Sequence, residues 1–224
     1  MIDEITENES DNRRLRITEI FHSLQGESRS VGFPTIFIRL TGCPLRCGYC
    51  DTEYAFSGGQ WMELDEIVHQ VKLLSASYVT VTGGEPLAQK ACIPLLTRLC
   101  DLGLEVSLET SGALDIGQVD TRVSRVMDLK TPGSGEMDKN RTENITLLTP
   151  NDQVKFVVAD RRDFDWSCEQ IKEKQLLERC EVLVSPVHGS LDADELAGWV
   201  IESGLPIRFQ VQLHKLLWGD EPGR

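Results

Sequence analysis

The sequence predicts an α/β fold with a parallel β-sheet at its centre, on the basis of three observations. Short apolar runs rich in β-branched residues alternate with segments in which apolar residues recur at helical spacing. The chain has 224 residues, which suits one sizeable domain. Glycine, hydroxyl, cysteine and charged residues follow directly after several of the runs. A barrel or partial barrel and a doubly wound open sheet both fit, although a complete eight-fold barrel is tight at this length.

Seven apolar runs are the predicted strands. They are residues 36–40, 78–82, 104–110, 125–130, 153–159, 181–187 and 207–213. Three helices are predicted between them, at residues 63–75, 87–101 and 192–203. The first helix is the clearest, because Leu64, Ile67, Val68, Val71 and Leu74 fall on one helical face. Strand, helix, strand repeated in this way is typical of a parallel sheet with crossover helices.

Composition and charge limit the partners that we expect. Lysine plus arginine total 23 and aspartate plus glutamate total 36, which gives a net charge of −13. A nucleic-acid partner is not expected, because phosphate binding draws on a basic face. No apolar run approaches the ~20 residues that span a bilayer, and the acidic start does not resemble a signal or transit peptide. We expect a cytoplasmic protein with a flexible arm over residues 1–17 and one domain over residues 18–224.

The candidate functional site is expected where the strands end, since parallel α/β folds carry their chemistry at the carboxyl ends of the strands. Five of the predicted strands are followed by segments rich in glycine, hydroxyl groups, cysteine or charge. These segments are TGCPLRCGYCDT (41–52), GGEPL (83–87), TSG (110–112), KTPGSG (130–135) and SPVHG (185–189). We expect them to converge on one mouth.

Three cysteines after the first predicted strand are the strongest single signal. Cys43, Cys47 and Cys50 are spaced Cys-x3-Cys-x2-Cys, so their thiolates can wrap one iron–sulfur cluster and leave one iron open. A zinc site is the alternative, although zinc usually takes paired Cys-x2-Cys spacings. We expect the other four cysteines to be small core residues. They are Cys92, Cys100, Cys168 and Cys180.

The cysteine loop and a glycine-rich segment together resemble the radical SAM superfamily. Tyr49 precedes the last cysteine, and Gly83-Gly84-Glu85-Pro86 ends the next predicted strand, where the superfamily has its motif for S-adenosylmethionine (SAM). The resemblance implies a partial (β/α)6 TIM-like barrel, a 4Fe–4S cluster and SAM bound to the open iron. It also implies that cleavage of SAM yields a radical that takes a hydrogen atom from the substrate. The two glycines let the backbone approach SAM closely, and Glu85 offers an acceptor at the same edge.

A longer stretch resembles one family of this superfamily, the 7-carboxy-7-deazaguanine synthases. The segments TEIFHSLQGES (18–28) and GFPTIFIRLTGCPLRCGYCDTEYAF (32–56) carry the resemblance, which extends from about residue 18 to residue 218. It implies conversion of 6-carboxy-5,6,7,8-tetrahydropterin to 7-carboxy-7-deazaguanine with loss of ammonia, in queuosine and 7-deazapurine biosynthesis. It further implies regeneration of SAM, dependence on Mg²⁺, a homodimer and a reducing protein such as flavodoxin.

The resemblance also implies roles for individual residues. The substrate contacts are Leu24, Gln25, Gly26, Glu27, Arg39, Thr82 and His214. The guanidinium of Arg39 suits a planar carboxylate, and the amide and carboxylate of Gln25 and Glu27 suit a pterin edge. Thr52 corresponds to the Mg²⁺ ligand, at a site that substrate oxygens and waters complete.

The SAM-binding set implied by the resemblance is spread over four strand ends. It comprises Tyr49, Cys50, Asp51, Gly84, Asp128, Leu129, Lys130, Ser185, Pro186, Val187 and His188. Glu109 and Ser111 either face SAM or are solvated loop residues, and no residue is assigned a catalytic role beyond the cofactor-held radical. Two other functions stay open: a glycyl-radical activating enzyme that acts on a protein partner, and a non-catalytic zinc-binding module. The LQGE segment and Arg39 argue against the first.

Overall fold

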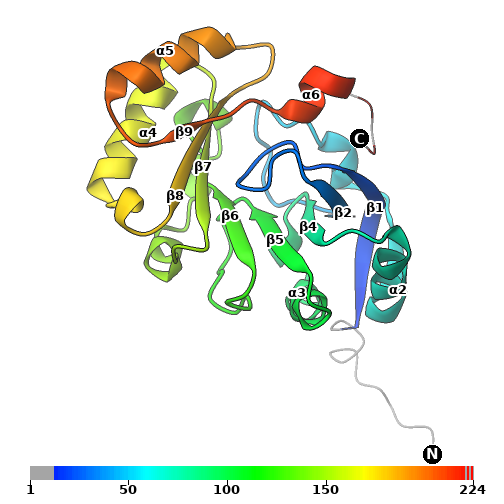
Figure 1. The fold of residues 1–224 in the computed structure, drawn as a ribbon. Helices are drawn as coiled ribbons and strands as arrows, with labels where there is room; N and C mark the ends of the chain where they lie inside the picture. Colours follow the sequence, from blue (N-terminus) through cyan, green and yellow to red (C-terminus); the bar gives the residue numbers. More distant parts are fainter. Residues whose placement is uncertain (1–12, 220, 222, 224) are drawn as a thin grey trace, which may run out of the picture.

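One nine-stranded sheet forms the centre of the computed structural model, which describes residues 13–219, 221 and 223 (Figure 1). In spatial order its strands are β3-β1-β2-β4-β5-β6-β7-β8-β9. The bounds are β1 (Arg14–Leu24), β2 (Pro34–Leu40), β3 (Gln60–Glu63), β4 (Tyr78–Gly83), β5 (Glu105–Thr110), β6 (Ser124–Asp128), β7 (Gln153–Val158), β8 (Glu181–Pro186) and β9 (Arg208–Phe209). All neighbours from β2 to β9 pair in parallel, whereas β1 and β3 are antiparallel additions at one edge.

The parallel strands curve into the partial (β/α)6 TIM-like barrel that the superfamily resemblance implies (Figure 1). Helices α2 (Leu64–Leu74), α3 (Cys92–Asp101), α4 (Arg161–Glu173) and α5 (Ala193–Ser203) lie on the outside of the curved sheet. A doubly wound sheet has helices on both faces and is therefore not the fold. Between β6 and β7 three short 3₁₀ helices, within residues 132–147, take the place of a crossover α-helix. None of the described helices combines the length and apolar character that crossing a bilayer requires.

Alternation along each strand separates the hydrophobic core from an inner cavity. In β2, Ile36 and Ile38 pack in the core, whereas Phe37 and Arg39 line the cavity. In β7 the same alternation places Lys155 on the cavity side, between two core residues. Because successive side chains of a strand point to opposite faces, one face of the sheet is apolar while the other carries the polar groups of the site.

The predicted strand over residues 207–213 is wrong for most of its length. Only Arg208–Phe209 pairs with β8 as β9, and α6 (Leu213–Trp218) begins where the strand was predicted to end. The reason is tertiary, since the chain leaves the sheet after Gln210 and the amide of Leu213 donates to the carbonyl of Gly26 at 3.0 Å.

Helix α3 begins at Cys92, five residues later than predicted. Residues Pro86–Ala88 form a 3₁₀ helix, and the Glu85 carboxylate accepts a hydrogen bond from the amide of Leu87 at 3.0 Å. Helix α4 was not predicted, because its sequence is strongly polar and only a narrow stripe is buried. Its start is nevertheless well specified, since the side chain of Asp160 accepts a hydrogen bond from the amide of Asp163 at 2.9 Å.

The two antiparallel strands β1 and β3 were also not predicted. Strand β1 begins at Arg14, so residues 14–17, assigned to the flexible arm, pair with β3 instead. Residues 1–12 lie outside the described residues.

A buried ion pair joins β6 to the turn before β7. Arg125 donates to the carboxylate of Asp152 from its Nε at 2.9 Å and from its Nη2 at 2.5 Å, and Thr149 donates to the same carboxylate from its amide and its hydroxyl. The side chains of Arg125 and Asp152 are 6% and 1% exposed. The pair therefore has the bidentate geometry and extra hydrogen bonds that a buried charge needs.

We expect Asp152→Ala to lower the free energy of unfolding by about 3–5 kcal/mol, because Arg125 then keeps a buried charge without its partner. Chemical unfolding of the purified protein measures this change. Asp165→Ala is the control, since it removes only the exposed pair with Arg161 on α4, at a cost below about 1 kcal/mol. Equal losses in the two variants would contradict the prediction.

Candidate active site

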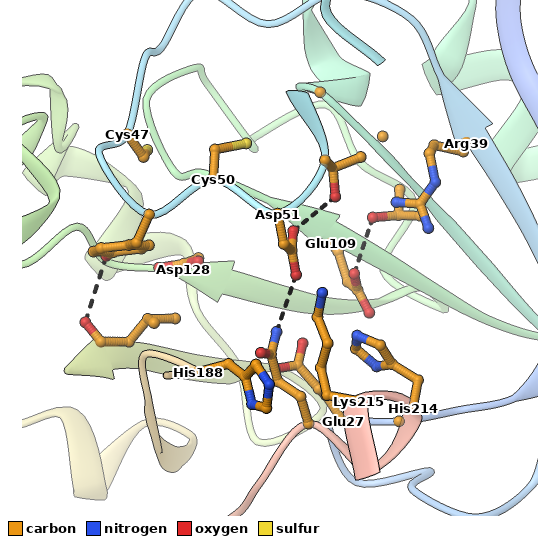
Figure 2. A pocket seen from close by; sticks show the side chains of 18 of the residues that line it. Glu27, Arg39, Cys47, Cys50, Asp51, Glu109, Asp128, His188, His214 and Lys215 are labelled. Carbon is orange, nitrogen blue, oxygen red and sulfur yellow. Dashed lines mark hydrogen bonds between the residues drawn. The ribbon is translucent and has the colours of Figure 1, made fainter. Parts of the chain in front are cut away.

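One cavity of about 680 Å³ lies at the carboxyl ends of the parallel strands. It is walled by the loop after β2, the end of β4, inward side chains of β5, β6 and β7, the loop after β1, and α6. Most residues assigned to the site from the sequence line it, and Figure 2 shows how several of them lie. Those lining residues are Leu24, Gln25, Gly26, Glu27, Arg39, Cys43, Cys47, Tyr49, Cys50, Asp51, Thr52, Thr82, Gly84, Asp128, Lys130, Val187, His188 and His214.

Three residues of the implied SAM-binding set lie outside the cavity lining. Leu129 is a core residue, and Ser185 and Pro186 are buried at the end of β8. The resemblance implied runs of consecutive residues, whereas a strand presents only alternate side chains to one face. Among them only Ser185 has a polar side-chain atom, and no described residue hydrogen-bonds to its hydroxyl.

The cysteine loop places three free thiols on the cavity wall. Burial raises the pKa of Cys43, Cys47 and Cys50, while the nearby Lys130 ammonium lowers all three. The amide of Leu45 donates to the Sγ of Cys43 at 3.4 Å. An amide donor and a cation both stabilise thiolates, so these residues fit an iron–sulfur cluster.

No three cysteine, histidine, aspartate or glutamate side chains in the described part of the chain converge as ligands of a single ion would. This arrangement is compatible with an iron–sulfur cluster, because each thiolate binds a different iron of the cube.

The end of β4 lies against the cysteine loop at a distance that only glycine permits. A Cβ on Gly84 would lie 2.1 Å from the carbonyl oxygen of Gly42 and 2.8 Å from the Cβ of Cys43. Gly83 has a φ of 144°, and a Cβ there would meet the carbonyl oxygen of Leu40 at 2.2 Å. The two glycines therefore let the end of β4 pack directly against the backbone of Leu40 and Gly42, and we call this close contact beside the thiols the glycine cradle.

Glu85 does not face this cradle, contrary to the sequence analysis. Its side chain is fully buried and accepts hydrogen bonds from the amide of Ser111 at 2.7 Å and from the hydroxyl of Thr110 at 2.9 Å. The carboxylate thus joins the end of β4 to the end of β5. Ser111 lines the cavity but gives its own hydroxyl proton to Glu85.

Glu109 lies on the cavity wall and is not a solvated loop residue. It belongs to β5, where its carboxylate accepts hydrogen bonds from Thr82 Oγ1 at 2.9 Å and from Gln25 Nε2 at 3.4 Å (Figure 2). Burial raises the pKa of Glu109, and the Lys155 ammonium opposes that rise. Gln25 also donates to the hydroxyl of Thr80 at 2.9 Å, which fixes its amide inside the barrel.

Arg39 is held by three residues that the sequence analysis missed. Its Nε donates to Glu19 Oε1 at 2.7 Å, and the hydroxyl of Tyr54 donates to the same oxygen at 2.8 Å. The guanidinium carbon lies 5.7 Å from the ring centre of Phe21 and 5.8 Å from that of Tyr54, within cation–π range. Burial raises the pKa of Tyr54 to about 12, so this hydroxyl keeps its proton and donates. Only the register of β1 on β2, which sets Glu19 opposite Arg39, reveals this arrangement.

Asp51 and Thr52 form a pair of oxygen donors beside the last cysteine. The hydroxyl of Thr52 donates to Asp51 Oδ1 at 2.8 Å, and Gln212 Nε2 donates to Asp51 Oδ2 at 3.2 Å. Burial alone raises the pKa of Asp51, but the hydrogen bond from Thr52 and the charges of Lys215 and Lys155 outweigh it and lower the pKa. The carboxylate is therefore ionised at neutral pH.

Helix α6 closes one side of the cavity over the loop that follows β1. A Cβ on Gly26 would lie 2.5 Å from Nδ1 of His214, so these two residues are in close contact. Burial lowers the pKa of His214, while Glu27 and Asp51 oppose that change. The sequence analysis named His214 and Gly26 but missed Lys155 and Gln212, although a lysine inside the apolar run of β7 could have indicated the first of these.

The curved barrel, the three thiols and the glycine cradle define the class of this protein, and a family comparison agrees with them. The model described as "Radical SAM superfamily" matches residues 37–174, which is more than half of the chain. The protein is a radical SAM enzyme, and its cofactors are a 4Fe–4S cluster and SAM. A non-catalytic zinc-binding module is therefore not supported.

Curated relatives narrow the assignment. A 7-carboxy-7-deazaguanine synthase of Chlorobaculum tepidum is 43% identical over 210 residues, which cover 92% of this chain and 96% of the relative. One from Koribacter versatilis is 41% identical over 222 residues, covering 92% and 98%. The chain belongs to the 7-carboxy-7-deazaguanine synthase family. The crystal structure of QueE from Escherichia coli supports the fold, with a TM-score of 0.75 at 21% identity over 94% of this chain and 100% of that one.

We expect Gly84→Ala to impair cluster assembly, because the new methyl group would displace the cysteine loop. Overpacking against backbone costs about 1–3 kcal/mol, and here the cost falls on the cluster ligands. Iron and sulfide analysis after anaerobic reconstitution measures the effect, and thermal unfolding measures the stability.

Gly198→Ala on α5 is the matched control. A Cβ at Gly198 has no described atom within 4 Å, so this variant is expected to keep its iron and to gain about 0.5–1 kcal/mol of stability. Full iron content in Gly84→Ala would show that the close approach is not required.

Proposed function

We propose that the protein converts 6-carboxy-5,6,7,8-tetrahydropterin to 7-carboxy-7-deazaguanine and releases one ammonia per turnover. One observation carries the proposal: the three cysteines share a single cavity with Arg39, Gln25 and Glu27. The names of the relatives and the LQGE segment support the same assignment. Substrate and product differ by one NH₃, so ring contraction with elimination balances without an external oxidant.

The cofactor half of the cavity is formed by the cysteine loop and the ends of β4, β6 and β8. When bound, the cluster and SAM supply an electron and a radical that abstracts hydrogen. We assign the cluster to Cys43, Cys47 and Cys50. The residues that we assign to SAM are Tyr49, Asp51, Gly84, Asp128, Lys130, Val187 and His188, all of which line the cavity.

The substrate half is formed by Arg39, the loop after β1, and Thr82. Glu19 accepts a hydrogen bond only from the Nε of Arg39. The two Nη nitrogens of Arg39 make no hydrogen bond within the described residues. We propose that they grip the substrate carboxylate as a fork. Gln25 and Glu27 then contact the donor and acceptor edge of the pterin, and His214 contacts its far side.

Thr52 is the candidate Mg²⁺ ligand. Its hydroxyl lies beside the Asp51 carboxylate, and substrate oxygens and waters would complete the octahedron that this cation prefers. The contacts of α6 with Gly26 and with Asp51 help to keep water out of the cavity.

Three further properties belong to the proposal. We propose a homodimer, a reducing protein such as flavodoxin as the electron source, and a cytoplasmic location. The seven free cysteines support a reducing compartment.

Anaerobic turnover tests the function. The reconstituted protein is incubated with the carboxytetrahydropterin, SAM, Mg²⁺ and a reductant, and the products are analysed by mass spectrometry. We expect the deazaguanine product without any added protein partner, a result that also excludes a glycyl-radical activating enzyme. Cys47→Ala is expected to lose iron and turnover, whereas Cys168→Ala, on α4, is expected to keep both. Absence of product from the iron-loaded wild type would refute the assignment.

Arg39→Ala is expected to raise the KM for the substrate by about 30-fold or more, since truncating one member of a buried charge pair costs 2 kcal/mol or more. Iron content and SAM binding should stay at the wild-type level. Arg39→Lys is expected to recover only part of the affinity, because an ammonium cannot form the fork. Arg162→Ala, exposed on α4, is the control. An unchanged KM in Arg39→Ala would remove Arg39 from the substrate site.

A further inference from the structure

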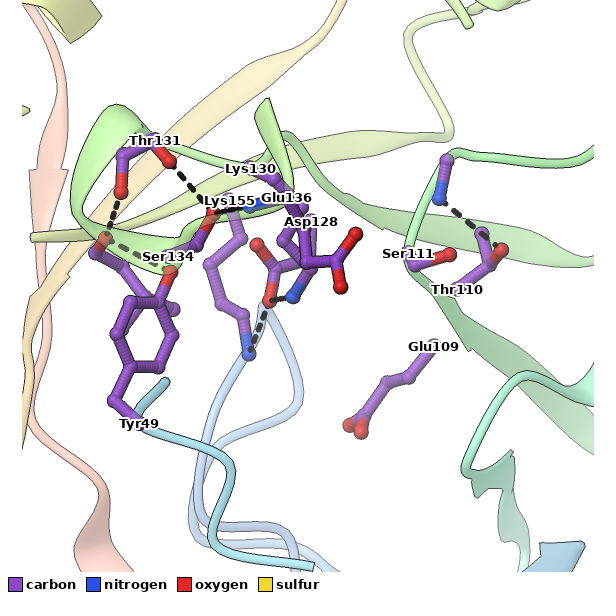
Figure 3. A network of polar contacts seen from close by, with 12 residues as sticks. Tyr49, Glu109, Thr110, Ser111, Asp128, Lys130, Thr131, Ser134, Glu136 and Lys155 are labelled. Atoms are coloured by element: carbon purple, nitrogen blue, oxygen red, sulfur yellow. Dashed lines mark hydrogen bonds and ion pairs between the residues drawn. The ribbon is translucent and has the colours of Figure 1, made fainter. Parts of the chain in front are cut away.

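A buried lysine connects the two halves of the cavity. Lys155 Nζ lies 2.8 Å from Glu27 Oε2 and 4.0 Å from Asp128 Oδ2, and Lys130 Nζ lies 2.9 Å from that same Asp128 oxygen. Figure 3 shows Lys155, Asp128 and Lys130 gathered in this network. The side chain of Lys155 is 11% exposed. It therefore stands between the loop assigned to the substrate and the strand end assigned to SAM.

Each of the two carboxylates has one oxygen occupied by a lysine and one that is not. Glu27 Oε1 and Asp128 Oδ1 are both buried, and neither has a hydrogen-bond partner among the described residues. A buried acceptor without a donor is unfavourable, because it has lost its hydrogen bonds to water. Because both residues line the cavity, a bound ligand is in position to supply the missing donors.

Lys155 carries its positive charge beside both carboxylates. Burial tends to lower the pKa of Lys155, but Glu27, Asp128 and Glu109 surround it and raise the pKa above its usual value. The lysine is thus a permanent cation at neutral pH, and its ammonium group can only donate hydrogen bonds.

Lys155 is not needed merely to hold the loop after β1 in place. Arg29 of that loop pairs with Glu181 at 3.2 Å, and its amide donates to Gln153 Oε1 at 2.6 Å. The amide of Ser28 donates to Gln210 at 3.0 Å. The loop is therefore anchored to β7, to β8 and to the residue that follows β9 without the lysine, which leaves orientation of the carboxylates as the distinctive effect of Lys155.

We propose that Lys155 is a positioning residue that turns Glu27 Oε1 toward an N–H donor of the substrate and Asp128 Oδ1 toward a hydroxyl or ammonium donor of SAM. Lys155 holds Glu27 by a direct contact at 2.8 Å, whereas it acts on Asp128 through its charge at 4.0 Å, beside the direct contact of Lys130. The substrate half of this inference rests on the proposed function, whereas the SAM half rests only on membership of the superfamily.

Three variants test the role in anaerobically reconstituted, iron-loaded protein. Lys155→Met is expected to weaken SAM binding and to raise the KM for the carboxytetrahydropterin, each by at least about fivefold, the cost of misplacing one buried acceptor. Iron content should not change. Lys155→Arg is expected to show SAM binding and a KM between those of Lys155→Met and the wild type, because arginine keeps the positive charge. Lys172→Met, exposed on α4, is the control and should match the wild type. Equilibrium dialysis measures SAM, and initial rates give KM and kcat separately.

The outcomes separate a positioning role from a structural one. Wild-type SAM affinity and KM in Lys155→Met, with only a lower melting temperature, would overturn the inference. If that variant does not fold, Lys155→Met/Glu27→Gln removes the uncompensated charge, and it should bind SAM more weakly than Glu27→Gln alone. Failure of both to fold assigns Lys155 a structural role and also overturns the inference. Lack of product from the wild type refutes the proposed function instead, and SAM binding still tests Lys155.

Discussion

The parallel pairing of β2 with β4 is the constraint from which the rest of the site follows. Its register sets Leu40 beside Gly83, and the amide of Glu85 donates to the carbonyl of Gly42 at 2.8 Å. The first turn of the cysteine loop is thereby laid against the end of the neighbouring strand. Any side chain on Gly84 would separate the two segments. The thiol motif and the glycine motif are about forty residues apart in the sequence, yet a single hydrogen bond joins them in space. Together they form one wall of the cavity.

Charge inside the cavity is organised differently from charge on the whole chain. The net charge of −13 is a sum over the whole chain, whereas the cavity holds Arg39, Lys130 and Lys155, each paired with a carboxylate. Buried charges persist only with partners, because desolvation is costly. Each pair still leaves at least one polar atom without a hydrogen-bond partner among the described residues. The same ion pairs that make the cavity stable therefore make it a recognition site for charged and polar groups.

Contiguous motifs could be predicted from the sequence, and contacts across strands could not. The cysteine loop and Gly84 line the cavity as expected, because short loops at strand ends carry their own geometry. Glu19 is different, since it contacts Arg39 only through the register of β1 on β2. Strand β1 was not predicted, because polar and apolar residues are mixed along it and it has no apolar run. Leu129 was misassigned because alternation along a strand turns neighbours to opposite faces. The start of α6 likewise depends on a distant partner, the carbonyl of Gly26.

The region matched by the family model contains some of the segments that line the cavity and leaves others outside. The matched region, residues 37–174, contains the cysteine loop, the glycine cradle and Asp128, which are the parts that a shared cofactor chemistry requires. The loop after β1 and helix α6 lie outside that region, yet they meet each other across the cavity through Gly26 and His214. The shared barrel thus carries the cofactor side of the cavity, and under the proposed function two segments from outside the matched region join Arg39 and Thr82 in contacting the substrate. Lys155 is the point at which these halves touch, because it lies inside the shared region and pairs with Glu27 outside it.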